Sequence, residues 1–438
     1  MRVESLIRSL ALVTLFLTLA APVAAQRAGG PYAGILGTTE EPGRHSLIFR
    51  GSLFGAWDDI LTENENADPN VDPRFLRSGL AGGAEGGLTH VRRNDRVQWL
   101  SSADTAFRVY GSDDDAIAAT LTGRTDADMT MNSRISLRLG GGWSYSPYYE
   151  LSPTYGSQSS TVGSFGGGFG VATAAERNMS TDGRAGLSVQ LSRRDSIEFS
   201  GTARHWEFLD RPEATVVTYG GRSAYRHSLT RAFGIHAGFG RDEARYEFAD
   251  AEPVTTDTFD IGVDYGDTLE FTRRTALSFN FSTSAIRWNE DTHWRVNGSA
   301  ALTRAFGRNA SGLLRYQRDT EYAAGFREPL LTDTISGGFS NQLGRDTTWS
   351  LNAGYVRGEI GFGETAQRYN IYDAGGRLTR ALTRNLGVFG SYTYYRYDVP
   401  SAATVFAFYP TFSRQSISGG LTVWAPIIND TRPPRETK

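Results

Sequence analysis

Between about His45 and Trp424 the chain alternates apolar and polar residues over one strand-length stretch after another, with almost no helix-period segment. From Leu277 to Ala285, for example, most odd positions are apolar and the even positions are polar. Successive side chains of a β-strand point to opposite faces, so each such stretch has one apolar and one polar face. The pattern predicts strands that separate an apolar medium from water.

Period-two alternation and turn residues together predict about 18 strands, with 16–18 as the range. Their ends are set by clusters of Gly, Asn, Asp, Ser and Pro. The predicted spans are 44–58, 75–91, 95–110, 116–129, 133–146, 170–191, 195–207, 215–229, 232–248, 255–270, 275–288, 292–304, 309–322, 331–343, 347–358, 370–383, 385–398 and 412–425.

The connections between these strands alternate between two kinds. One kind is tight and contains arginine, as in Ser192-Arg193-Arg194-Asp195, and the other is longer, as in Pro147 to Phe169. Short periplasmic turns and longer outer loops are typical of bacterial outer-membrane barrels, and an even strand count returns both termini to one side. We therefore predict an all-β fold, a transmembrane antiparallel up-and-down β-barrel.

Two other all-β folds share part of this pattern. A soluble sandwich would turn the apolar faces inward, but 18 strands in one sandwich domain are unusual. A β-propeller would repeat every 40–50 residues, as this chain nearly does, but it would not alternate short and long connections. Both alternatives fit the connections less well than a barrel does.

The cost of placing a charge in lipid decides which face points where. An arginine facing lipid at the middle of the bilayer costs about 2–4 kcal/mol, so the polar face must enclose the lumen. A barrel of this width is too wide for side chains to fill and leaves an aqueous space. The residues expected to face the lumen are Arg50, Arg138, Glu198, Arg204, Asp260, Asp264, Asn280 and Asn352.

Aromatic residues on the apolar face are expected at the two membrane interfaces, where their rings sit in the apolar edge. The cluster of tyrosines between 392 and 397 divides by parity. Tyr392 and Tyr394 share the face of Leu386, whereas Tyr395 and Tyr397 share that of Phe389 and could point inward. The candidate aromatic girdle comprises Trp57, Trp143, Tyr145, Tyr265, Trp349, Tyr355, Tyr392 and Tyr394.

The N-terminal segment has the features of a cleaved export signal. Arg2 and Arg8 precede the apolar run Leu10 to Ala20, and small residues at 23–25 suit a signal peptidase. The run is too short for a membrane anchor. We expect a signal peptide at 1–25, a periplasmic lead-in at 26–43, the barrel at 44–425 and a polar tail at 426–438.

Composition narrows the classes of function. Lys and Arg number 45 against 48 Asp and Glu, a formal charge of −3, so the basic excess of a nucleic-acid binder is missing. The chain has no cysteine, which excludes thiol chemistry and Cys-based metal sites. Its six histidines form no HExxH spacing, and Gly166 to Gly170 lacks the lysine of a phosphate loop. Asp113 to Asp115 fit a solvated acidic loop. We expect no enzyme, no catalytic residue, no metal site and no cofactor.

The export signal, the strand count, the arginine-containing turns and the final strand Ser418 to Trp424 resemble the β-barrel porins of Gram-negative outer membranes. Over about 44–425 the resemblance extends to the 18-stranded barrels associated with exopolysaccharide export. One departure is that about 13 residues follow Trp424, whereas classical porins end at a terminal aromatic.

The resemblance implies an outer-membrane channel with a polar lumen that takes part in polysaccharide export. Outer-membrane lipid, lipopolysaccharide and periplasmic polysaccharide-export proteins would then be its partners. Two alternatives remain open, a general or sugar-selective diffusion porin and a structural barrel whose lumen is plugged. Conductance would separate the last from the other two.

Overall fold

The structure is a computed structural model. It describes residues 32–37, 44–60, 78–110, 116–147, 149–150, 172–174, 177–230, 233–247, 253–265, 269–272, 275–288, 291–307, 309–322, 326, 328–363, 366–400 and 411–430. The predicted signal peptide and most of the predicted tail lie outside these residues. Among the described residues, no helix is long and apolar enough to span a bilayer.

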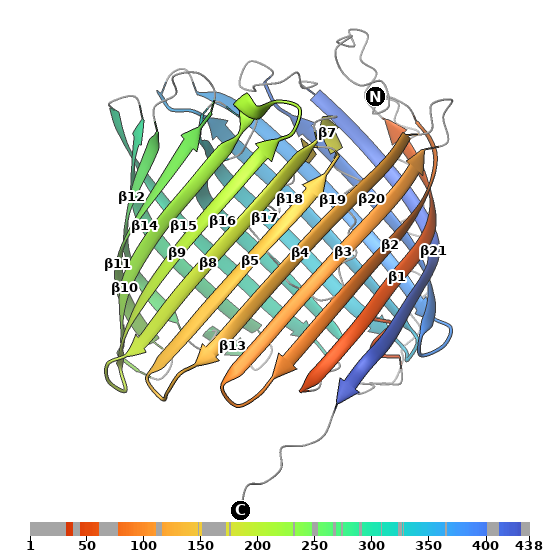
Figure 1. The fold of residues 1–438 in the computed structure, drawn as a ribbon, viewed down its shortest axis with the longest axis horizontal. Coiled ribbons are helices and arrows are strands. Elements are labelled where there is room, and N and C mark those ends of the chain that lie inside the picture. Colours follow the sequence, from red (N-terminus) through yellow and green to blue (C-terminus); the bar gives the residue numbers. More distant parts are fainter. Residues whose placement is uncertain are drawn as a thin grey trace, which may run out of the picture.

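Long tilted strands make up nearly all of the described chain (Figure 1). Most have 12–16 residues, enough to cross an apolar layer at a tilt. In the main sheet they are β1 (His45–Ile60), β2 (Gly79–Arg93), β3 (Val97–Tyr110), β4 (Ala116–Thr130), β5 (Ile135–Ser146), β8 (Asn178–Gln190), β9 (Asp195–Phe208), β10 (Val216–Ser228), β11 (Phe233–Tyr246), β12 (Val254–Tyr265), β13 (Leu269–Thr272), β14 (Thr275–Trp288), β15 (Asp291–Phe306), β16 (Ala310–Glu321), β17 (Leu330–Leu343), β18 (Thr347–Ile360), β19 (Gln367–Ala381), β20 (Leu386–Asp398) and β21 (Thr411–Asp430).

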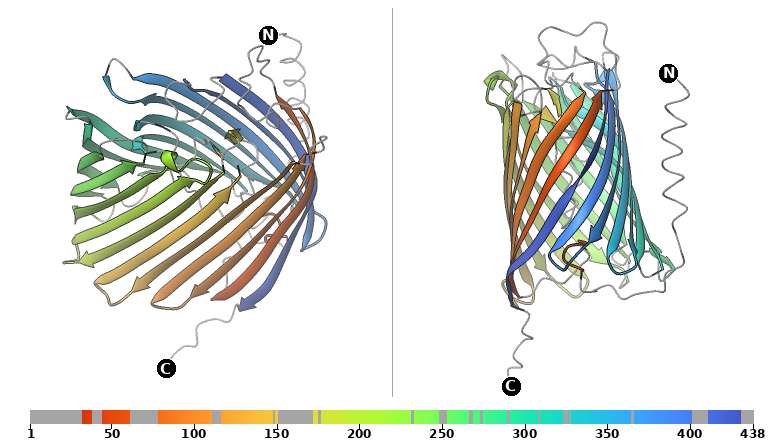
Figure 2. Two further views of the ribbon diagram at one scale, coloured as in Figure 1. Left: turned by 45° about the horizontal axis from the view of Figure 1, so that its top comes forward. Right: turned by 90° about the vertical axis from the view of Figure 1, so that its right-hand side faces the viewer.

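Each strand pairs antiparallel with the next, and β1 pairs with β21, which closes the sheet into a barrel (Figure 2). The described part of the sheet has 19 strands, but β12 and β13 both pair with β14 and share one position in the ring. The ring therefore has 18 positions. This confirms the predicted all-β, antiparallel barrel and its strand count.

The two ends of the barrel differ as the connections predicted. The tight-turn end, at the bottom of Figure 1, carries the β2–β3, β4–β5 and β8–β9 hairpins. The loop end carries the short 3-10 helix η3 (Pro212–Ala214) and a separate two-stranded sheet of β6 (Tyr149–Glu150) and β7 (Ala172–Ala174). The start of β1 and the end of β21 lie at the tight-turn end, because His45 pairs with Asp430 and also with Arg92, which lies beside the β2–β3 turn.

Four of the tight turns use the same hydrogen-bond arrangement. A polar side chain that opens the turn accepts backbone N–H groups two and three residues later. Asn94 accepts from Arg96 and Val97, and Asn132 accepts from Arg134 and Ile135. Ser192 and Thr383 do the same through their hydroxyls. The side chain accepts hydrogen bonds from backbone amides that have no partner in the strand pairing at the end of the hairpin.

Three predicted strands have different boundaries in the structure. The predicted strand 170–191 begins only at Asn178, because 172–174 form the separate strand β7. The predicted strand 255–270 is divided between β12 and β13. The last strand continues past Trp424 to Asp430, five residues into the predicted tail, because the first strand continues to pair with it after a register shift beyond Leu47.

Candidate functional site: the barrel interior

The inner face is identified by contacts between strands that are not neighbours in the ring. Tyr322, at the end of β16, shares a hydrogen bond with Thr256 of β12. Asp58 of β1 bonds Arg108 of β3, across the intervening strand. The cross-strand register places Asp58, Arg108 and Thr256 on one face of the sheet, and the most deeply buried side chains, such as Phe208 and Tyr395, share that face, so it is the inner one. The alternate positions, including Leu53, Leu80, Ile117, Ile261 and Trp294, are exposed and point outward.

A large apolar cluster fills part of the interior at the loop end. We call it the interior cluster. Its members come from η3, β9–β12, β14 and β17–β21 and the connections between them, and none comes from β1–β5 or β8. Its largest fully buried members include Phe208, Ile286, Tyr395 and Tyr397. Aromatic packing contributes to it, since the Tyr397 and Phe412 rings stack with centroids 5.5 Å apart. One side of the loop-end mouth is therefore packed with side chains.

The opposite side of the interior, formed by β1–β5 and β8, stays polar. We call it the polar wall. Across β3, β4, β5 and β8, the residues Asp104, Thr122, Ser144 and Ser180 are consecutive cross-strand partners and form one row. The Ser144 and Ser180 hydroxyl oxygens are 2.8 Å apart. A hollow of about 260 Å³ lies over this row and the next. Its polar lining is Ser102, Asp104, Thr122, Arg124, Ser144, Ser180 and Asp182.

Glycines allow several inward carboxylates to lie flat on the wall. Gly87 is the cross-strand partner of Asp104, and Gly142 is that of Asp182. A Cβ at either glycine would overlap the facing carboxylate. Gly220 with Asp242 and Gly354 with Asp373 repeat the arrangement on other strands. Each glycine gives an acidic side chain room to fold sideways, which leaves more of the lumen cross-section open.

A buried ion cluster joins the ends of the ring near the loop-end mouth. The carboxylate of Asp58 accepts two bonds from Arg108, at 2.7 and 2.6 Å, and a further bond from Arg414 of β21. All three side chains are 5% exposed or less. Because β1 and β21 close the barrel, this cluster ties the closing seam to β3.

Charged side chains also approach one another across the lumen. Glu85 of β2 interacts electrostatically with Arg377 of β19, although three strands separate them in the ring. Arg204 of β9 likewise interacts with Glu321 of β16, and its guanidinium lies 4.8 Å from the Trp206 ring. These partners lie four and six positions apart in the ring of 18, and the barrel is broader in one direction than the other (Figures 1 and 2).

Residues 32–37 pack inside the tight-turn mouth. Ala33, Ile35 and Leu36 are buried, and Ile35 and Leu36 cluster with Ala381 and Trp424. Gly34 lies directly on the indole, because a Cβ there would overlap the ring. The N-terminal lead-in, which the sequence placed only in the periplasm, thus contributes six residues to the lumen.

Six of the predicted lumen residues lie on the inner face by position in their strands: Arg50, Arg138, Glu198, Arg204, Asn280 and Asn352. Arg138 pairs with Asp128 at 3.2 Å, and Asn280 accepts from the amide and hydroxyl of Ser299. Asp260 and Asp264 belong to β12, but their side chains lie outside the described part of the structure. Their roles in a lumen stay predictions, and only the hollow brings several polar groups together.

Seven of the proposed girdle residues have outward positions: Trp57, Trp143, Tyr145, Trp349, Tyr355, Tyr392 and Tyr394. The side chain of Tyr265 lies outside the described part. Tyr395 and Tyr397 are 1% exposed and point inward, into the interior cluster. Contact with a membrane interface stays a prediction for all eight.

The interior cluster is what sequence reasoning missed. Assigning apolar residues to lipid and polar ones to water predicted a wet lumen, yet Trp206 and Phe208 share the inner face with Glu198 and Arg204. A signal was present: along β9 the large apolar residues change parity, from Ile197 and Phe199 to Trp206 and Phe208 near the loop end. The assignment of apolar residues to the outer face fails where the inner face packs against other protein side chains instead of water.

The described residues contain no group of three or more His, Asp or Glu side chains arranged to hold a metal ion. At the loop end, Arg177 and Asp210 form an exposed ion pair outside the strands, and the hydrogen bond from Arg177 lowers the pKa of the Asp210 carboxyl.

No protein-family model matches the sequence, and no curated protein matches it. Among solved structures, OpdQ of Pseudomonas aeruginosa is similar at a TM-score of 0.42 and 10% identity, over 88% of this chain and 98% of OpdQ. OccK7 (OpdD) of the same organism gives 0.43 and 11%, over 88% and 100%. OccAB4 of Acinetobacter baumannii gives 0.37 and 10%, over 87% and 98%. We draw no conclusion about this chain from likenesses this distant.

Proposed function

We propose that this protein is an outer-membrane channel through which small polar solutes diffuse along the polar wall. The exterior supports a membrane location, because large apolar side chains such as Leu53, Ile261 and Trp294 are exposed on strand after strand. Monomeric soluble proteins rarely expose a continuous apolar surface of that extent. A closed barrel also leaves no unpaired strand edge, as a lipid environment requires.

The observation that carries the proposal is the asymmetry of the interior. The interior cluster occupies the side formed by β9–β21, whereas β1–β5 and β8 keep hydroxyls, carboxylates and arginines around an open hollow. Water and small solutes would follow this wall. The reduced mouth favours small solutes over a polymer chain.

Planar-bilayer recording of the purified, folded barrel tests the proposal. We expect a stable single-channel conductance that falls in Ser144→Trp, because the indole would fill the hollow. Ser336→Trp is the matched control, since Ser336 lies on the inner face of β17, away from the hollow. A folded wild-type barrel that gives no conductance would refute the channel, and equal conductance in the two variants would refute the path.

Two other functions can be separated from this one. Polysaccharide export stays a prediction, and deletion of the gene followed by measurement of surface polysaccharide tests it. Unchanged polysaccharide with reduced solute uptake would favour diffusion. A barrel that is closed at rest is supported by one observation, the packing of residues 32–37 against Trp424 in the tight-turn mouth. Recordings from that barrel would show no basal current.

A further inference from the structure

The outer surface of β9, β10 and β11 contains an apolar groove. Ser223 of β10 is the cross-strand partner of both Phe199 and Phe239, so a small side chain lies between two rings. Both rings are nearly half exposed, at 49% and 45%. Ile197, Tyr225 and Ala237 form the next row toward the tight-turn end. Together these side chains line a cavity of about 470 Å³ that opens outward.

Polar groups limit the groove at both ends. Toward the loop end, the partner of Gly221 is Arg241, whose guanidinium lies 3.8 Å from Asp257. Toward the tight-turn end, the limit is His227. Gly221 and His227 are six positions apart, about 20 Å of strand. At a tilt of about 40° this is about 15 Å along the membrane normal, half of a hydrocarbon core of about 30 Å. The groove thus has the depth of one leaflet.

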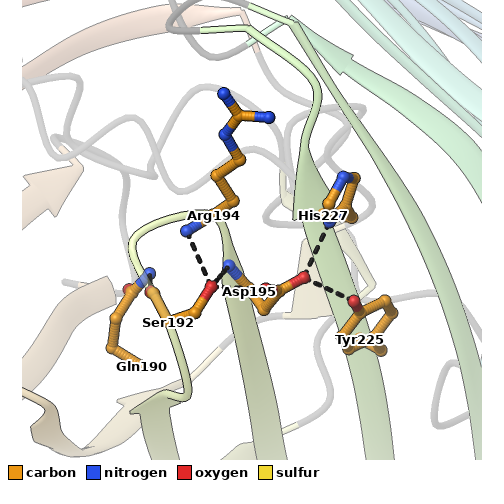
Figure 3. A network of polar contacts seen from close by, with 6 residues as sticks. All are labelled: Gln190, Ser192, Arg194, Asp195, Tyr225 and His227. Carbon is orange, nitrogen blue, oxygen red and sulfur yellow. Dashed lines mark hydrogen bonds and ion pairs between the residues drawn. The ribbon is translucent and has the colours of Figure 1, made fainter.

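A hydrogen-bonded network holds the tight-turn end of the groove in place (Figure 3). Asp195, at the start of β9, accepts a hydrogen bond from the Tyr225 hydroxyl at 2.5 Å and lies 2.7 Å from Nδ1 of His227. Ser192 accepts the backbone amides of Arg194 and Asp195. The network fixes the Tyr225 ring as the lower wall of the groove. The turn that carries the exposed residues Arg193 and Arg194 lies at this end of the groove, because the carbonyl of Arg194 accepts the amide of Ser228, the residue after His227.

We propose that this groove binds one glycerophospholipid of the leaflet at the tight-turn end. An acyl chain would lie between Phe199 and Phe239 over Ser223, and the phosphate would meet Arg193 and Arg194. Arginine suits a phosphate because its planar guanidinium donates two parallel hydrogen bonds. The inference depends on the membrane location proposed above but not on channel activity.

The groove's position favours a lipid over a second copy of the chain. It lies in the apolar belt, where acyl chains are the surrounding medium, and it ends at a basic turn, so its chemistry changes from apolar to cationic over one leaflet. Lipopolysaccharide would lie in the opposite leaflet. Its phosphates could therefore not reach Arg193 or Arg194.

Native mass spectrometry of the purified barrel, titrated with phosphatidylethanolamine, tests the proposal. Ser223→Phe would place a ring on the groove floor, and losing contact with two methylenes alone would weaken binding about tenfold. Ala353→Phe, at an outward position of β18 away from the groove, is the matched control. Arg193→Ser with Arg194→Ser should also weaken binding, whereas Arg93→Ser with Arg96→Ser, at the β2–β3 turn, should not.

One further probe tests the role of the phosphate. Diacylglycerol, which lacks the phosphate, should bind Arg193→Ser/Arg194→Ser and wild type alike. Equal phosphatidylethanolamine binding by Ser223→Phe and Ala353→Phe would overturn the proposal, as would a dimer that Ser223→Phe abolishes. If Ser223→Phe fails to fold, Ala237→Leu narrows the same groove. A variant that keeps its conductance but loses the lipid separates this inference from the channel proposal.

Discussion

The Asp58 carboxylate bonds both Arg108 and Arg414, and all three side chains are nearly inaccessible to water. Removing its charge takes the bonded carboxylate away from two buried guanidinium groups, which is costlier than replacing the whole ion cluster by apolar residues. We expect Asp58→Asn to lower the free energy of unfolding in guanidinium by about 3 kcal/mol. Asp128→Asn breaks a largely exposed pair with Arg138 and should cost under about 1 kcal/mol. Equal losses would contradict the role of burial.

Gly142 decides where the Asp182 carboxylate lies. In Gly142→Ala the new methyl group would overlap that carboxylate, so Asp182 must turn away from the wall and into the hollow. A carboxylate in the path attracts cations, and we expect reversal potentials under a salt gradient to shift toward cation selectivity. Gly186, on the inner face of β8, is the matched control. A Cβ added there would have its nearest atom at 3.8 Å, an ordinary van der Waals contact. Gly186→Ala should leave the ion selectivity unchanged. If the reversal potential shifts in both variants, the space at Gly142 is not what holds the Asp182 carboxylate against the wall.

At the scale of the element, the hairpins depend on a side chain that replaces missing ladder bonds. Thr383 accepts the amides of Asn385 and Leu386 at 3.2 and 3.0 Å. Thr383→Val keeps the shape and removes the acceptor, so we expect a loss of about 1 kcal/mol in unfolding free energy. Thr383→Ser restores the hydroxyl and should regain most of it. An unchanged midpoint in Thr383→Val would mean that water satisfies these amides equally well.

The alternation of apolar and polar residues was sufficient to predict the strands. A period of two identifies a strand and also assigns each of its residues to one face of the sheet. It gave the ring of 18 positions and placed Arg50 and Leu53 on opposite sides. It could not give the interior cluster, because the members come from strands far apart in the ring, such as β9 and β20, and meet only by inward packing, which no local pattern encodes. The same holds for Asp58 and Arg414, which are 356 residues apart in sequence.

At the scale of the whole molecule, the lumen is narrowed from both ends by different means. At the loop end the interior cluster is built from the strands themselves, so it is part of the fold. At the tight-turn end the closing element is the short segment 32–37, which precedes the first strand. An element outside the ladder can leave without breaking a strand pair, so the tight-turn mouth is where the conductance can change most easily.

Gly34→Val tests that asymmetry. The backbone of Gly34 lies on the Trp424 indole, and any larger residue would overlap the ring, so the segment must leave the mouth or shift. Ile35 and Leu36 belong to the same segment, so they leave the mouth together with Gly34. The burial of their side chains, which stabilises the docked segment by about 2 kcal/mol each, is then lost. We expect single-channel conductance to rise and the free energy of unfolding to fall by at most the burial lost with the segment, because no strand pair is broken. Gly183→Val, where nothing lies within 4 Å of a Cβ, is the matched control and should conduct as wild type does. Unchanged conductance in Gly34→Val would show that residues 32–37 do not obstruct the path, and the restriction would then belong to the interior cluster alone.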